Sequence, residues 1–256
     1  MDNYQIGLLT TVLLGIFILL GAGISLLINK KDKIIDFSIG LAFGVITTLI
    51  ITDLLPEIFE GLGLKYIYVF IICTTVGFFL LRLLDSFIPD HHEHNHMNKK
   101  ENTANLTHIG IMTTLALFLH NIIEGMAVYS TALSDSSLAL SLAIGVGFHN
   151  VPLGMVIASS FYHSSKDKLR TIISVILASI STFCGGLIMY CFKFANINEL
   201  FLGAILSITL GMLLFIVIDE LYPRIKDTKQ KKATYTGMCI GIVILLLSML
   251  IAWLHY

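Results

Sequence analysis

Charged side chains are scarce in this chain of 256 residues: Lys, Arg, Asp and Glu make up 13% of it, whereas hydrophobic residues make up 56%. That charged fraction is about half of what a soluble globular domain carries, so a soluble fold would expose a large apolar surface to water. The four cysteines have neither the spacing of a disulfide framework nor that of a zinc ribbon. The sequence also lacks a nucleic-acid-binding motif and a phosphate-binding glycine loop, so we expect no nucleic-acid partner and no organic cofactor.

The hydrophobic residues fall into long blocks separated by polar breaks. Each block is long enough to cross a hydrocarbon core of about 30 Å as a helix of ~20 residues. We therefore predict an all-α, polytopic membrane protein, folded as a single transmembrane domain over residues 1–256. The eight predicted helices cover residues 5–28, 34–55, 66–88, 107–131, 136–161, 169–193, 199–223 and 233–255.

Basic residues are distributed unequally between the loops on the two sides of the membrane. The loops on one side hold thirteen Lys and Arg residues, whereas those on the other side hold only Lys65 and Lys193. By the positive-inside rule, the basic side is cytoplasmic. We therefore expect a multi-pass protein of the cell membrane with both termini extracytoplasmic.

The loop at residues 89–106 lies on the cytoplasmic side of this map and is rich in histidine. Its histidines are His91, His92, His94 and His96. A tract of this kind has no apolar face that could pack against the bundle. Two interpretations stay open: a solvated polar linker, or a segment that collects metal ions weakly.

Two similar polar motifs interrupt the fourth and fifth predicted helices. The first begins at His120 and reads HNIIEGM, and the second begins at His149 and reads HNVPLGM. Each histidine lies thirteen residues after the predicted start of its helix, which places it roughly 20 Å along the helix, near the membrane midplane. Glu124 lies one helical turn after His120, and an ionised side chain at this depth costs about 2.5–3.5 kcal/mol unless it has a partner.

These residues are candidate metal ligands. An imidazole and a carboxylate one turn apart can bind the same ion, and His149 can add a third ligand from an antiparallel fifth helix. The alternative is that each histidine only forms a hydrogen bond between helices. The repeated motif at matching depth favours a metal site, and its presence on helices of opposite direction indicates an inverted repeat of three, two and three helices.

Acidic residues mark the ends of two other predicted helices. Asp53 and Glu57 lie at the outer end of the second helix, and Asp219 and Glu220 lie at the inner end of the seventh. They either form entrance and exit vestibules for a cation or are helix-end residues that reach water. The sequence leaves both interpretations open.

Together these features resemble the ZIP (Zrt/Irt-like) family of divalent metal transporters. The resemblance covers the eight spans, the external termini, the histidine-rich loop after the third helix, and the two motifs. It implies a transporter, not an enzyme, that moves metal toward the cytoplasm between helices four and five. His120, Glu124 and His149 would then be the metal ligands, with Asn121 and Asn150 as neighbouring candidates.

The resemblance also implies a substrate and partners. Zinc is the first candidate substrate, and iron, manganese and cadmium are alternatives, because mixed imidazole and carboxylate ligands suit all of these ions. The expected partners are metal ions and the lipid bilayer. The oligomeric state is left open, a homodimer included.

The chain departs from the family pattern at three positions. Ile123 replaces the motif proline of helix four, Leu153 replaces the motif glutamate of helix five, and Thr182 stands where many members have a glutamate in helix six. Glu124 is then the one acidic ligand, so we predict a single bound ion. Two alternatives remain: a transport-deficient metal sensor, and a membrane-embedded zinc hydrolase, for which the H-E-x-x-H motif is missing.

Overall fold

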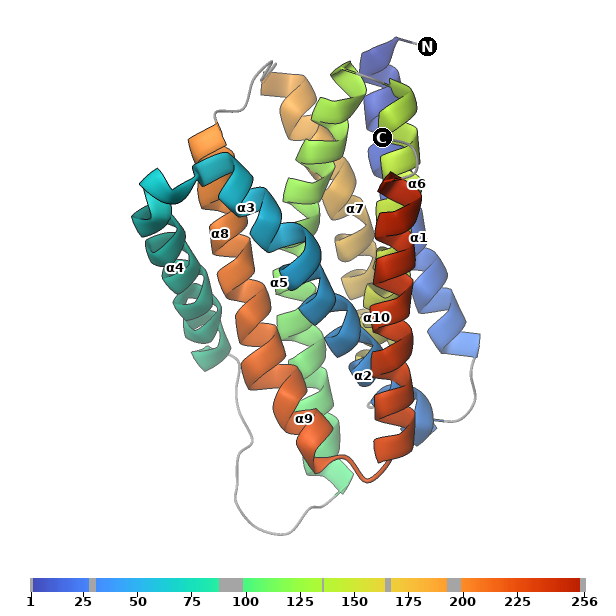
Figure 1. Ribbon diagram of the computed structural model, residues 1–256. Helices are drawn as coiled ribbons and strands as arrows, with labels where there is room; N and C mark the ends of the chain where they lie inside the picture. The colour runs from blue at the N-terminus through green and yellow to red at the C-terminus, as the bar shows by residue number, and fades with distance from the viewer. Residues whose placement is uncertain are drawn as a thin grey trace.

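The computed structural model of the protein describes residues 2–27, 31–87, 99–134, 136–163, 167–192 and 199–253. Every regular element within these ranges is helical. Eight helical segments are long and apolar enough to cross a membrane, which confirms the predicted all-α polytopic bundle. Figure 1 shows that the start of α1 and the end of α10 lie toward the same end of the bundle, as an even number of crossings requires.

Three membrane helices precede the histidine-rich loop and five follow it. The first three are α1 (Asn3–Leu27), the continuous segment of α2 (Lys31–Leu49), η1 (Ile50–Leu54) and α3 (Leu55–Leu62), and α4 (Ile67–Ser86), which follows the short turn η2 (Leu64–Tyr66). The next three are α5 (Lys99–Ser134), α6 (Ser136–Ala158) with its extension η3 (Ser159–His163), and α7 (Lys168–Phe192). The last two are the continuous segment of α8 (Glu199–Phe215), η4 (Ile216–Leu221) and α9 (Tyr222–Asp227), and α10 (Lys231–Trp253).

The second and seventh membrane helices each continue through a proline. Pro56 lies in the first turn of α3, directly after the π-helical turn η1, and Pro223 lies in the first turn of α9, directly after η4. A wide turn changes the hydrogen-bond register, so that the proline falls where a helix needs no N–H donor. These helices therefore extend past the predicted ends at residues 55 and 223, to Leu62 and Asp227.

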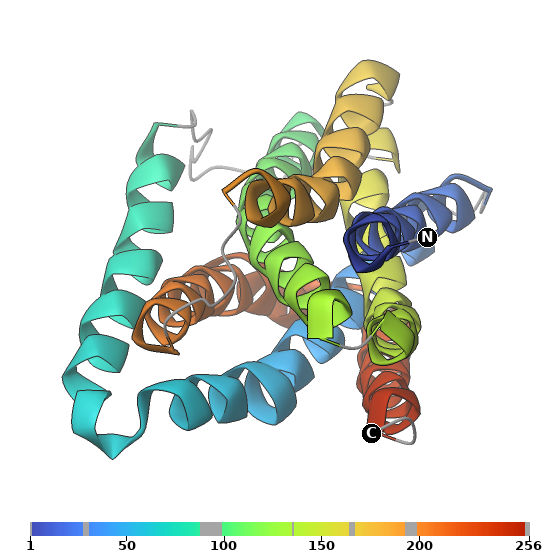
Figure 2. The same cartoon turned by 90° about the horizontal axis from the view of Figure 1, so that it is seen from above.

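The helices pair in a pattern that agrees with the predicted inverted repeat. α1 packs along α6, and α7 packs along α5; likewise α4 packs along α8, and α10 packs along α2. A two-fold axis can exchange the first three membrane helices with the last three, and the fourth with the fifth. This exchange converts the α1–α6 pair into the α7–α5 pair, and the α4–α8 pair into the α10–α2 pair. One group of helices is thus α1, α5, α6 and α7, and Figure 2 shows α4, next to α8, at the edge of the bundle away from that group.

Glycines allow the backbones of α5 and α7 to touch. A Cβ atom added at Gly125 would overlap the carbonyl oxygen of Thr182, and one added at Gly185 would overlap the carbonyl oxygen of Ile122. Helices in a membrane associate through such close packing of small residues, because lipid gives them no hydrophobic driving force. This contact holds the α5 motif at a fixed depth against α7.

Replacing Gly185 with valine is expected to prevent this packing. The added side chain meets backbone, which cannot move aside, and overpacking of this kind costs about 1–3 kcal/mol or more. We expect most of the Gly185→Val protein to be lost or aggregated in size-exclusion profiles of detergent extracts. Gly23→Val is the matched control, since a Cβ at Gly23 meets nothing within 4 Å; equal recovery of the two variants would contradict the expectation.

Candidate metal centre between two helices

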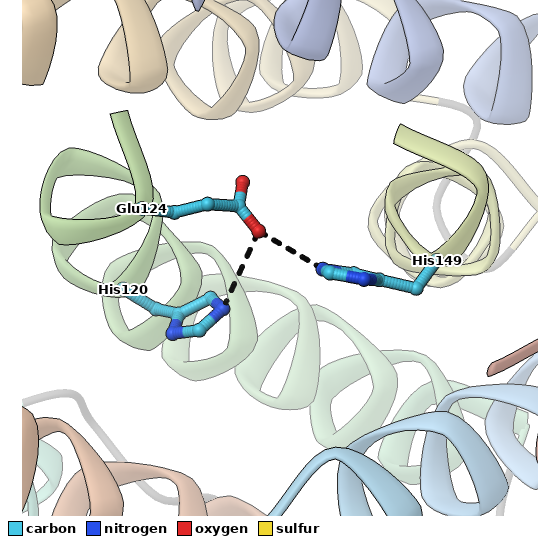
Figure 3. Close-up of side chains that lie close together, drawn as sticks. All are labelled: His120, Glu124 and His149. Atoms are coloured by element: carbon cyan, nitrogen blue, oxygen red, sulfur yellow. Dashed lines mark hydrogen bonds and ion pairs between the residues drawn. The ribbon is translucent and has the colours of Figure 1, made fainter. Parts of the chain in front are cut away.

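Three ionisable side chains converge in the interior of the bundle, as Figure 3 shows: His120 and Glu124 from α5, and His149 from α6. The Nε2 atom of His149 lies 3.0 Å from Oε1 of Glu124, and Nε2 of His120 lies 4.0 Å from the same oxygen. One ligand atom from each residue lies within 4.8 Å of the others. The structure thus brings together the three residues that the sequence predicts as metal ligands.

The site lies near the middle of both helices and is closed to solvent. His120 is 7% exposed and His149 is 4% exposed. His120 and Glu124 share a face of α5 because they are one helical turn apart. Pro152 interrupts the backbone hydrogen bonding of α6 close to His149, since it cannot donate to the carbonyl of Phe148.

The two asparagines that follow the histidines have different partners. The side-chain amide of Asn150 donates a hydrogen bond of 3.0 Å to Oε2 of Glu124, whereas that of Asn121 donates one of 3.1 Å to the carbonyl of Ala178 on α7. Asn150 therefore orients the carboxylate so that its other oxygen faces the two imidazole rings. Asn121 instead links α5 to α7.

Removing the amide of Asn150 is expected to weaken metal binding. Loss of a residue that orients a ligand typically costs about 10–100-fold in metal affinity, so we expect a loss of that size for Asn150→Ala. Competition against a zinc-chelating dye measures it on purified protein. Ser130→Ala is the control, because the Ser130 hydroxyl donates only to Met126 of its own helix; an unchanged affinity in Asn150→Ala would contradict this role.

Leu153 and Thr182 stand where the family pattern has glutamates, and neither supplies an acidic ligand to the site. Leu153 is buried one turn after His149. The hydroxyl of Thr182 donates a hydrogen bond of 2.9 Å to the carbonyl of Thr11 on α1. Glu124 is therefore the one carboxylate of the three-residue group.

The acidic residues expected at the helix ends lie on π-helical turns or directly after them. Asp53 belongs to η1 and Glu57 to α3, and both side chains are exposed. At the other end of the bundle, Asp219 of η4 lies 3.6 Å from the guanidinium group of Arg82. The loop histidines at 91, 92, 94 and 96 lie outside the described residues.

A second cluster brings Glu220 together with two residues that sequence reasoning missed. His108 of α5 lies with Nε2 2.6 Å from Oδ1 of Asp85 on α4 and 3.2 Å from Oε1 of Glu220 on η4. Each residue comes alone from a different helix, so no motif marks them. The only signal in the sequence was that all three are ionisable and lie at the ends of predicted spans on the same, cytoplasmic side.

The fold is that of a polytopic membrane protein, and the buried His–Glu–His group places three candidate cation ligands in its interior. The family profile described as ZIP Zinc transporter matches residues 88–249, and the chain belongs to that family. This confirms the resemblance and the prediction of a transporter instead of an enzyme.

Similarity to named relatives extends over nearly the whole chain. Three of them carry the name zinc transporter ZupT and are each 26% identical to this chain. The protein of Clostridium perfringens matches over 98% of this chain and 97% of its own length, that of Chlorobium luteolum over 98% and 99%, and that of an Enterobacter species over 96% and 97%.

Proposed function

We propose that the chain transports divalent metal ions toward the cytoplasm through the site of His120, Glu124 and His149. Zinc is the first substrate, since the relatives are named zinc transporters, and iron, manganese and cadmium are alternatives. The observation that carries the proposal is the convergence of three metal-ligand atoms in the interior of a membrane bundle.

The spacing of these atoms suits zinc. Zinc binds imidazole nitrogen and carboxylate oxygen at about 2.0–2.2 Å in a tetrahedral shell, which separates neighbouring ligand atoms by roughly 3.4 Å. The distances of 3.0 Å and 4.0 Å from Glu124 Oε1 to the two histidines lie on either side of this value. Nε2 of His120 is buried without a hydrogen-bond partner among the described residues, and coordination of an ion would satisfy this nitrogen instead.

The charge of the site suits transport of one ion at a time. Two neutral imidazoles and one carboxylate leave a bound divalent ion with a formal charge of +1. The three protein ligands also leave a fourth position for water or for a passing ligand. Incomplete neutralisation and an incomplete shell both favour release, which a transporter needs.

The charge of the loops and the membrane potential support the proposed direction of transport. By the positive-inside rule, the basic loops favour a cytoplasmic location for the end of the bundle that contains α9. An inside-negative potential favours inward movement by about 2.3 kcal/mol per charge per 100 mV, so by roughly 5 kcal/mol for a divalent ion. Asp53 and Glu57 would line the entrance, and Asp219 and Glu220 the cytoplasmic exit.

Zinc influx into proteoliposomes that enclose a zinc-sensitive dye tests this function. We expect purified protein to carry zinc into the vesicles, faster under an inside-negative potential than under an inside-positive one. Protein-free liposomes prepared in parallel provide the background rate. Zinc binding without any flux would instead support a metal sensor.

A further inference from the structure

We infer that Asp85, His108 and Glu220 form a second divalent-metal site, at the cytoplasmic end of the bundle in the orientation proposed above. One ligand atom from each residue lies within 4.8 Å of the others, as in the central site. The three residues come from α4, α5 and η4. The site therefore exists only when these three helices are folded together.

The geometry fits a bound ion after small side-chain shifts. Nε2 of His108 is 2.6 Å from Asp85 and 3.2 Å from Glu220, against roughly 3.4 Å for neighbouring ligands of a tetrahedral zinc ion. Glu220 is 8% exposed, and the side chains of Asp85 and His108 are 25% and 14% exposed. The group is therefore shielded from bulk water but remains within reach of an ion.

The π-helical turn η4 directs two consecutive acids to different partners. Asp219 pairs with Arg82 of α4 at 3.6 Å, and Glu220 faces His108 of α5 at 3.2 Å. Asp219 is thus already compensated by a guanidinium group. Asp85 and Glu220 both pair with the imidazole ring of His108. Two carboxylates around one imidazole are a set of ligands suited to a divalent cation.

The second site should hold its ion more tightly than the central one. Two carboxylates and a neutral imidazole bring a divalent ion to a formal charge of zero, against +1 for His120, Glu124 and His149. His108 and His120 lie on the same helix, twelve residues apart, which corresponds to about 18 Å along its axis. A bound ion would also link α5, which carries the central site, to α4 and to the η4 segment that continues α8.

Zinc binding to a full-length protein without its other candidate ligands tests this inference. His120→Ala and His149→Ala remove the central site, and alanine at the four loop histidines removes the loop as a competing ligand. In this background, equilibrium dialysis should give one zinc ion per chain, and zinc should raise the melting temperature. His108→Ala should abolish both effects, and Asp85→Asn or Glu220→Gln should weaken binding at least about 10-fold.

Asp227→Asn is the matched control and should bind like the background protein, because Asp227 is exposed at the end of α9 and belongs to neither three-residue group. No zinc bound in the background protein, or binding unchanged by His108→Ala, would overturn the inference and leave His108 as a hydrogen-bonding partner of the two carboxylates. Glu220→Gln keeps the shape of the side chain, so it serves as the test if His108→Ala does not fold. Because the background lacks the central site, the outcome is independent of whether that site transports metal.

Discussion

Zinc uptake is expected to fall at least about 100-fold when Glu124 is replaced by glutamine, because loss of a metal ligand should exceed the 10–100-fold typical of residues that only orient one. Glutamine keeps the shape of the side chain but removes the one negative charge among the three ligands. The initial rate of zinc-65 uptake by cells, normalised to protein at the surface, measures the effect. His120→Ala and His149→Ala should lower uptake to a similar extent.

The control for this prediction is Glu60→Gln, which changes an exposed carboxylate on α3 in the same way. Its uptake should equal that of the wild type. Uptake at the wild-type rate in all three ligand variants would remove His120, Glu124 and His149 from the transport path. Normal uptake in the histidine variants alone would restrict the site to Glu124.

The Leu153→Glu protein is expected to bind zinc more tightly than the wild type and to release it more slowly. Leu153 follows His149 by one turn, as Glu124 follows His120, so the new carboxylate would neutralise the remaining positive charge. Two unit charges of opposite sign 4 Å apart attract each other by about 4 kcal/mol at an effective dielectric constant near 20. After its own desolvation, we expect a gain in affinity of at least about 10-fold.

Zinc affinity and proteoliposome turnover, measured on the same Leu153→Glu preparation, check this prediction. Affinity should rise while turnover falls, and Leu153→Gln should reproduce neither change because it adds no charge. Weaker zinc binding in Leu153→Glu than in Leu153→Gln would show that position 153 does not face the ion. Flux in Leu153→Glu together with none in the wild type would instead identify the natural protein as a sensor.

The number of membrane helices and their approximate positions could be predicted from the sequence, because only long apolar helices can span the hydrocarbon core in a protein of this class. The helix ends were harder to predict at Pro56 and Pro223, because a proline usually indicates that a helix ends there. Both membrane helices continue because a π-helical turn precedes each proline, and such turns are rare inside α-helices. The prolines therefore indicate a change of hydrogen-bond register within a membrane helix.

The two clusters differ in how far the sequence predicted them. His120 and Glu124 are one turn apart, and the matching motif at His149 indicated the neighbouring helix, so the pattern itself predicted their convergence. Asp85 and His108 carry no such signal, because each is the only residue that its helix contributes to the second cluster. Their proximity depends on how α4 and α5 pack beside η4, which hydropathy does not reveal.

X-ray absorption spectroscopy of zinc-loaded protein tests the central claim most directly. Purified protein with alanine at His108 and at the four loop histidines retains only the central site as a histidine-containing candidate. We expect one zinc ion bound by two imidazoles at about 2.0 Å, with oxygen ligands completing the shell. A zinc spectrum without imidazole scattering would contradict this expectation.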